Sequence, residues 1–156
     1  MTKRIIVILL VVSIGVFAAA QTLQAQEESI GVGVQYQYPS FGLSGMFDVT
    51  EDVTVQGTVG FIGTVQTYGV RGLYHFTSDT FWRAYGYGEV GLINWQVAGD
   101  TETSFGGGIG AGVEYGLQAF NEELPPVYYN ANVGVVTNDY FDGFSMNFGT
   151  GVMFKF

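Results

Sequence analysis

Apolar and polar side chains alternate with a period of two along most of this chain, and the alternation continues to the last residue. In the closing stretch, FSMNFGTGVMFKF, Phe144, Phe148, Phe154 and Phe156 share one nearly apolar row, whereas the other row contains Ser, Asn, Gly, Met and Lys. Successive side chains of a β-strand point to opposite faces of its sheet. The pattern therefore predicts that the chain ends in a strand with one apolar face.

The same alternation recurs in seven earlier segments, each followed by residues typical of turns, and no long helical periodicity follows the N-terminal region. An even number of antiparallel strands brings both ends of a barrel to one side. We therefore predict an all-β fold, a single eight-stranded antiparallel up-and-down barrel, with its longest outer connections at residues 95–104 and 137–143. The predicted strands cover residues 31–38, 41–49, 53–63, 67–76, 81–95, 105–117, 127–136 and 144–156.

The first 25 residues have the composition of an export signal. Lys3 and Arg4 precede an apolar run of 16 residues, and the small and polar stretch QTLQAQ follows. A membrane-spanning helix needs about 18 or more apolar residues, although a retained membrane anchor is the alternative. We predict a cleaved signal peptide at residues 1–25 and a barrel at 26–156, with cleavage after Ala25 or after Ala20.

Two kinds of eight-stranded barrel fit this alternation. A soluble, lipocalin-like barrel turns its apolar row inward, and a membrane barrel turns it outward. The chain is 12% charged, against about a quarter for an ordinary soluble domain, and its polar rows consist mainly of Gly, Thr, Gln, Asn and Ser. An eight-stranded barrel has room only for packed side chains, which suits glycine-rich rows, so we predict a transmembrane barrel. Its interfacial aromatic residues would be Tyr36, Tyr38, Phe41, Phe61, Tyr68, Phe76, Trp82 and Phe105.

Charged residues on the polar rows would lie inside such a barrel. Arg71, Arg83, Glu89 and Glu114 fall on adjacent predicted strands at similar heights. A buried charge is retained only when it is paired and hydrogen-bonded. We therefore predict an Arg–Glu network across the lumen, acting either as a plug or as a gate or selectivity ring in a narrow pore. Further charges of the rim or lumen would be Asp48, His75 and Lys155.

The stretch FGGGIGAG resembles a nucleotide-binding glycine motif only in its spacing. That motif requires a turn from a strand into a helix, and here the glycines continue the strand alternation. If the fifth and sixth strands form a hairpin, Tyr85 and Tyr87 would point inward beside Gly110 and Gly112. Aromatic rings would then fill the space that glycine leaves on the neighbouring strand.

Few residues could support catalysis or metal binding. His75 is the only histidine, no serine stands two residues after it, and the chain has no cysteine. We predict no catalytic residue, cofactor or metal site. The 14 acidic residues outnumber the 5 basic ones, which argues against a nucleic-acid partner. The acidic residues Asp100, Glu102, Asp139 and Asp142 would meet anionic lipopolysaccharide only through divalent cations, or would repel it.

The closing residues GTGVMFKF resemble the assembly signal of outer-membrane barrels, with Gly151, Phe154 and the terminal Phe156 as its matching positions. The chain after residue 25 resembles the small eight-stranded outer-membrane barrels, the OmpX-like and OmpA transmembrane-domain group. This resemblance implies a monomer in the outer membrane of a Gram-negative-type cell, surrounded by lipid and lipopolysaccharide and assembled by the barrel-assembly machinery. We expect a non-enzymatic barrel with a filled lumen and a structural or surface-interaction role. A narrow pore for ions or small solutes is the alternative, and a lipid-modifying enzyme is the third hypothesis.

Overall fold

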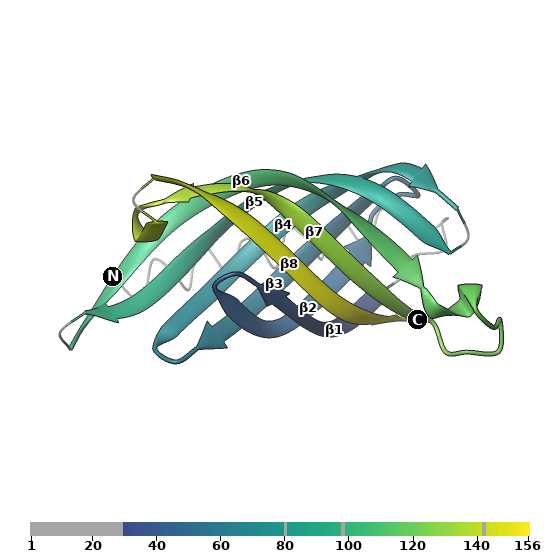
Figure 1. The fold of residues 1–156 in the computed structure, drawn as a ribbon, viewed down its shortest axis with the longest axis horizontal. Helices are drawn as coiled ribbons and strands as arrows, with labels where there is room; N and C mark the ends of the chain where they lie inside the picture. The colour runs from purple at the N-terminus through teal and green to yellow at the C-terminus, as the bar shows by residue number, and fades with distance from the viewer. Residues whose placement is uncertain (1–29, 80, 98, 142) are drawn as a thin grey trace.

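The computed structural model describes residues 30–156 except 80, 98 and 142, so the predicted signal peptide lies outside the described residues. Eight antiparallel strands form a closed barrel in which each strand pairs with its neighbours in the chain and β1 pairs with β8 (Figure 1). The predicted all-β, up-and-down barrel is confirmed. The strands are β1 (Ile30–Gln37), β2 (Ser40–Asp48), β3 (Val53–Ile62), β4 (Val65–Ser78), β5 (Trp82–Val97), β6 (Asp100–Gly116), β7 (Val127–Asn138) and β8 (Gly143–Lys155).

The barrel is closed by β1 and β8, and Ile30 and Phe156 exchange two backbone hydrogen bonds of 3.1 and 3.0 Å at one end. We call this end proximal and the opposite end distal. The turns β2–β3, β4–β5 and β6–β7 lie at the proximal end, and the other four lie at the distal end. Among the described residues, no helix is long and apolar enough to cross a membrane.

The two faces of the barrel wall have the opposite polarity to those of a soluble protein. Leu43, Phe105 and Phe144 are 67%, 67% and 85% exposed on the outer face, whereas Arg71 and Glu114 are buried in the lumen. Large apolar surfaces of this kind are not tolerated in water and mark contact with another molecule or a membrane. An apolar band that faces outward over a polar interior is typical of transmembrane barrels. The soluble, lipocalin-like alternative is therefore wrong.

Aromatic side chains border the outer apolar surface at both ends. Phe41, Phe61 and Phe105 are exposed near the distal ends of their strands, and Phe76 and Trp82 are exposed near the proximal end. These positions correspond to the two interfacial girdles that flank a transmembrane barrel. Further exposed aromatic residues extend the girdles, at Tyr38, Tyr68, Tyr74, Tyr115, Phe120, Tyr129, Phe144, Phe148, Phe154 and Phe156.

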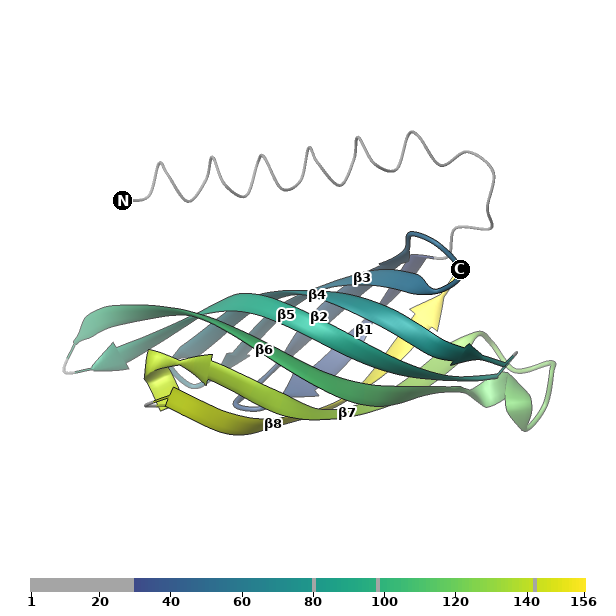
Figure 2. The same ribbon diagram turned by 90° about the horizontal axis from the view of Figure 1, so that it is seen from above.

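The strands around the barrel differ in length, and the prediction of two long distal connections was wrong. β5 continues to Val97 and β6 begins at Asp100, so most of the predicted loop at residues 95–104 is a hairpin that extends beyond the neighbouring strands (Figures 1 and 2). The alternation of side chains continues through this stretch, which contains β-branched threonines. Gly99 turns the chain with φ of +97°, a conformation that glycine adopts readily. Between Asn138 and Gly143 the chain forms a short 3₁₀ turn, η2 (Asp139–Phe141). The long connection lies instead at the proximal end, at residues 117–126, and contains η1 (Leu117–Ala119).

The register of β5 was the least clear of the eight strands in the sequence, and its pairing with β6 now defines it. Tyr85 pairs with Gly112 and Tyr87 pairs with Gly110, and both tyrosines are buried in the lumen. A methyl group at Gly112 would lie 2.5 Å from the hydroxyl oxygen of Tyr85, and one at Gly110 would lie 2.5 Å from that of Tyr87. The inward glycines of β6 are therefore the surface on which the two rings lie, as the glycine-rich pattern predicted.

Candidate functional site: the closed lumen

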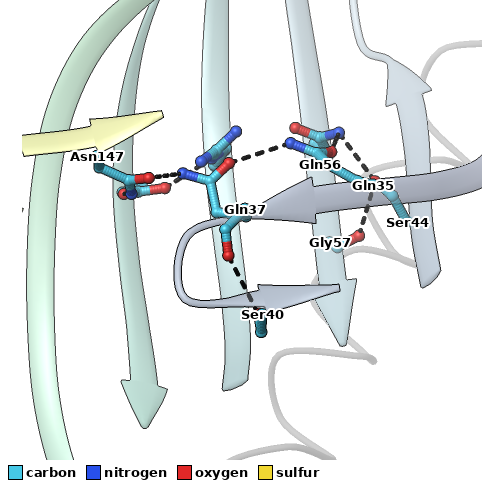
Figure 3. Close-up of polar contacts among 9 residues, drawn as sticks. Gln35, Gln37, Ser40, Ser44, Gln56, Gly57 and Asn147 are labelled. Carbon is cyan, nitrogen blue, oxygen red and sulfur yellow. Dashed lines mark hydrogen bonds and ion pairs between the residues drawn. The ribbon is translucent and has the colours of Figure 1, made fainter. Parts of the chain in front are cut away.

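A chain of side-chain amides crosses the distal half of the lumen. The amide nitrogen of Gln56 on β3 donates to Gln35 on β1 over 2.7 Å and to the hydroxyl of Ser44 on β2 over 2.8 Å. Gln35 in turn donates to Gln37 over 3.2 Å. Figure 3 shows the side chains of Asn147, Gln37 and Gln56 in a row, pointing toward one another. We call the set Gln35, Gln37, Ser44, Gln56 and Asn147 the amide relay.

The amide relay ends on an ion pair. Gln37 donates to Asn147 on β8 over 2.5 Å, and Asn147 donates to a carboxylate oxygen of Glu89 over 3.0 Å. The other oxygen of Glu89 accepts from Nε of Arg71 over 2.6 Å. The guanidinium of Arg71 also lies over the ring of Tyr87, 4.5 Å from its centroid. Hydrogen-bonded chains of this kind strengthen one another in a low dielectric, so the relay and the ion pair form one polar layer across the lumen.

A second polar layer closes the proximal half of the lumen. Nζ of Lys155 on β8 lies 2.6 Å from a carboxylate oxygen of Glu114 on β6 and 4.0 Å from one of Asp48 on β2. The ammonium also lies 4.7 Å from the centroid of the Tyr128 ring. Both members of the Lys155–Glu114 pair are almost fully buried. We call the set Asp48, Thr54, His75, Arg83, Glu114 and Lys155 the proximal cluster.

His75 and Thr54 complete the proximal cluster. The hydroxyl of Thr54 donates to Asp48 over 2.5 Å and lies 2.9 Å from Nε2 of His75. Arg83 lies 3.4 Å from the other carboxylate oxygen of Asp48 and is the more exposed partner of that pair. The imidazole of His75 is only 3% exposed. Its Nε2 atom is held in the hydrogen-bonded cluster by the hydroxyl of Thr54.

Apolar and aromatic side chains fill the space between the two layers. Leu73, Tyr85 and Tyr87 form a buried cluster, and Met46 and Met153 are buried on the opposite side of the lumen. Leu73 stands between Arg71 and His75 on the same inward row of β4, so it lies between the amide relay and the proximal cluster. The lumen is thus filled at three successive levels.

The structure brings together some of the predicted charges but not in one network. Arg71 and Glu89 are direct neighbours on β4 and β5 and form an ion pair. Arg83 and Glu114 are also direct neighbours, on β5 and β6. Glu114 nevertheless bonds to Lys155, and Arg83 pairs with Asp48. Two separate groups, one distal and one proximal, therefore take the place of the single Arg–Glu network.

The amides are the lumen residues that sequence reasoning missed. Gln35, Gln37, Gln56 and Asn147 all stand on polar rows and were visible as such. Three of their five hydrogen bonds join strands that are not consecutive in the chain, namely β3 to β1, β1 to β8, and β8 to β5. The only available signal was the pair of glutamines two residues apart, which placed both side chains on the same inward row.

A cavity of about 90 Å³ lies on the distal side of the amide relay. It reaches the β1–β2 turn at Tyr38 and Pro39, and Glu89 and Asn147 line it. Thr67 also lines the cavity and shares a hydrogen bond of 2.6 Å with Ser40. No group of three or more His, Cys, Asp or Glu side chains that could hold a metal ion occurs within the part of the chain that is described.

The three residues of the predicted assembly signal lie on β8 and directly after it. Phe154 and Phe156 are exposed on the outer face near the proximal end. Gly151 faces the lumen, where a methyl group would lie 2.8 Å from the carbonyl oxygen of Val34. Their recognition during assembly stays a prediction.

No protein-family model and no curated protein matches this chain. Among solved structures, the N-terminal β-barrel domain of Pseudomonas aeruginosa OprF superimposes with a TM-score of 0.62 at 19% identity, over 83% of this chain and 96% of that domain. Ail, the attachment invasion locus protein of Yersinia pestis, superimposes with a TM-score of 0.51 at 17% identity, over 83% of this chain and 97% of Ail. The chain therefore has the fold of the small eight-stranded outer-membrane β-barrels.

Proposed function

We propose that this protein is a non-enzymatic barrel of the outer membrane with a structural or surface-interaction role. Its filled lumen would make the barrel rigid. The observation that carries the proposal is the double closure of the lumen, by the amide relay with its Arg71–Glu89 pair and by the proximal cluster. A plugged barrel keeps a rigid wall in the membrane and leaves only its ends for contacts. The same fold supports an attachment invasion locus protein in Yersinia pestis.

The surroundings we propose are outer-membrane lipid and lipopolysaccharide, with the chain present as a monomer. The exposed apolar band and its two aromatic girdles support a lipid environment. The barrel-assembly machinery would act during biogenesis through Gly151, Phe154 and Phe156. The exposed distal acids Asp100, Glu102 and Asp139 would approach anionic lipopolysaccharide through divalent cations.

A narrow pore is the second candidate, and one observation favours it. Both layers that close the lumen are polar, and ion pairs can exchange partners in a way that apolar packing cannot. If the two closures opened together, ions or small solutes would meet a channel lined by amides and carboxylates.

Single-channel recording of the refolded chain in a planar bilayer separates the two candidates. We expect no stepwise current from the wild type or from Glu89→Ala and Glu114→Ala singly, because the other closure remains in each single variant. In the double variant the apolar level of Leu73, Tyr85 and Tyr87 remains, so we expect at most brief, small openings, and circular dichroism of every sample would confirm that the barrel is folded. Discrete currents from the folded wild type would contradict the plugged barrel and favour the pore.

A further inference from the structure

We propose that the distal cavity is a binding site for a small aliphatic ammonium cation, with Glu89 as the residue that receives its positive charge. This inference goes beyond the structural role proposed above, and it holds whether or not the lumen conducts. It is based on the size of the cavity, the position of its carboxylate and the distribution of charge at the two ends of the barrel.

The cavity has room for a ligand of only a few non-hydrogen atoms. Its volume is about 90 Å³, and a single water molecule needs about 10–15 Å³ when volume is measured in this way. Glycines contribute much of its wall, including Gly91 and Gly106, and at both positions a methyl group would meet the backbone of the neighbouring strand. The site therefore suits a short linear molecule or the end of a longer one.

The floor of the cavity presents a fixed and partly accessible carboxylate. The side chain of Glu89 is 15% exposed, whereas that of Arg71 is 3% exposed beneath it. Asn147 donates to one oxygen of Glu89 and Arg71 to the other. Each carboxylate oxygen accepts more than one hydrogen bond, so a ligand ammonium can be added on the cavity side without displacing either donor.

Charge at the distal end favours a cation over a neutral or anionic ligand. Glu89 is the one charged residue among the described residues that line the cavity. Arg71 is buried beneath it, and Arg83 and Lys155 belong to the proximal cluster. Asp100 and Asp139 are exposed in the distal turns. A cleft with charges of one sign and low-dielectric walls concentrates ions of the opposite sign.

The upper part of the cavity suits the alkyl portion of such a ligand. Ile93 and Val136 both contribute apolar surface to the wall of the cavity. A short alkylamine would place its ammonium on Glu89 and its methylene groups beside these two side chains. An alcohol of the same length would make the same apolar contacts but would lack the charge.

The test is an isothermal titration of the refolded full barrel, in uncharged detergent at low salt, with 1,4-diaminobutane and with 1,4-butanediol. We expect saturable binding of the diamine and binding of the diol that is weaker by about tenfold or more. Equal binding of the two probes, or no saturable binding of the diamine, would overturn the proposal.

Three variants locate the site. Ile93→Trp fills the cavity without a change of charge and should abolish binding, and Glu89→Gln should weaken it by about tenfold or more. Glu123→Gln, at an exposed carboxylate of the proximal connection at residues 117–126, is the matched control and should leave the affinity unchanged. Glu89→Gln removes the anionic partner of the buried Arg71 and could unfold the barrel. Ile93→Trp is therefore the decisive variant. Undiminished binding by folded Ile93→Trp would show that the diamine binds elsewhere, for example at the acidic rim.

Discussion

The two closures of the lumen are built from the same kinds of residues but differ in their surroundings. Each contains one ion pair of 2.6 Å. In the distal layer, Glu89 also accepts a hydrogen bond from Asn147 of the amide relay and borders a cavity. In the proximal cluster, Glu114 and Lys155 are both enclosed, beside Tyr128 and Asp48. We therefore expect the environment of each ion pair, more than its length, to decide how much the stability of the fold depends on it.

The largest loss of stability should follow removal of the enclosed carboxylate. Glu114→Ala leaves the ammonium of Lys155 buried with only the more distant Asp48 as its anionic partner, and breaking a buried pair costs about 3–5 kcal/mol. We expect a clear fall in the free energy of unfolding, measured by urea titration of the barrel in lipid vesicles. A Glu114→Ala variant that unfolds at the same urea concentration as the wild type would contradict the proposed role of the proximal cluster.

The corresponding change in the distal layer should have a smaller effect. In Glu89→Ala, the guanidinium of Arg71 keeps its contact with the ring of Tyr87, and the position that the carboxylate leaves borders the distal cavity, from which water can reach it. The loss should therefore be nearer to that of a hydrogen bond to a charged group, about 1.5–3 kcal/mol. The same urea titration measures it. If Glu89→Ala lowered the free energy of unfolding more than Glu114→Ala, enclosure of the ion pair would not explain the difference between the two layers.

The space between the layers can be probed with glycine substitutions on one hairpin. Gly112→Ala forces a methyl group against Tyr85 and, at 2.7 Å, against the carbonyl oxygen of Ala131, so we expect a loss of about 1–3 kcal/mol from overpacking. Gly88→Ala is the matched control, because nothing lies within 4 Å of a methyl group there. Equal effects of the two variants would mean that the tyrosines do not depend on the inward glycines.

The smallest effect should come from the exposed member of the proximal cluster. The side chain of Arg83 is 28% exposed and lies 3.4 Å from Asp48, and pairs that water reaches contribute about 0–1 kcal/mol. Arg83→Ala should therefore scarcely change the unfolding midpoint. A loss as large as that of Glu114→Ala would indicate that Arg83 and Glu114, which are neighbours on β5 and β6, act as one pair as the sequence suggested.

The fold could be predicted from the sequence because its main determinant is local. A period of two over eight segments specifies strands, and the glycine-rich polar rows indicate which face points into a narrow lumen. The distal extension of β5 and β6 was missed because polar residues such as Asp100, Thr101 and Glu102 are typical both of loops and of strands in water. Nothing in their composition marks the point where the membrane ends and the hairpin continues.

The site could be predicted only in part, because its contacts cross the lumen. Arg71 and Glu89 are on consecutive strands and can be paired by aligning one hairpin. Glu114 and Lys155 are on β6 and β8, with β7 between them. Which inward residues meet across a barrel depends on strand tilt and stagger, and these properties are set by all eight strands together.

The central claim, that two polar layers seal the lumen, can be tested most directly by thiol accessibility, because the chain has no cysteine. Ile93→Cys places a thiol in the distal cavity, and Leu73→Cys places one between the amide relay and the proximal cluster. With the barrel in lipid vesicles, a water-soluble maleimide should label Ile93→Cys rapidly and should label Leu73→Cys only after unfolding in urea. Equal labelling of the two folded variants would show that water and solutes pass the layers, and would contradict the account of a closed lumen.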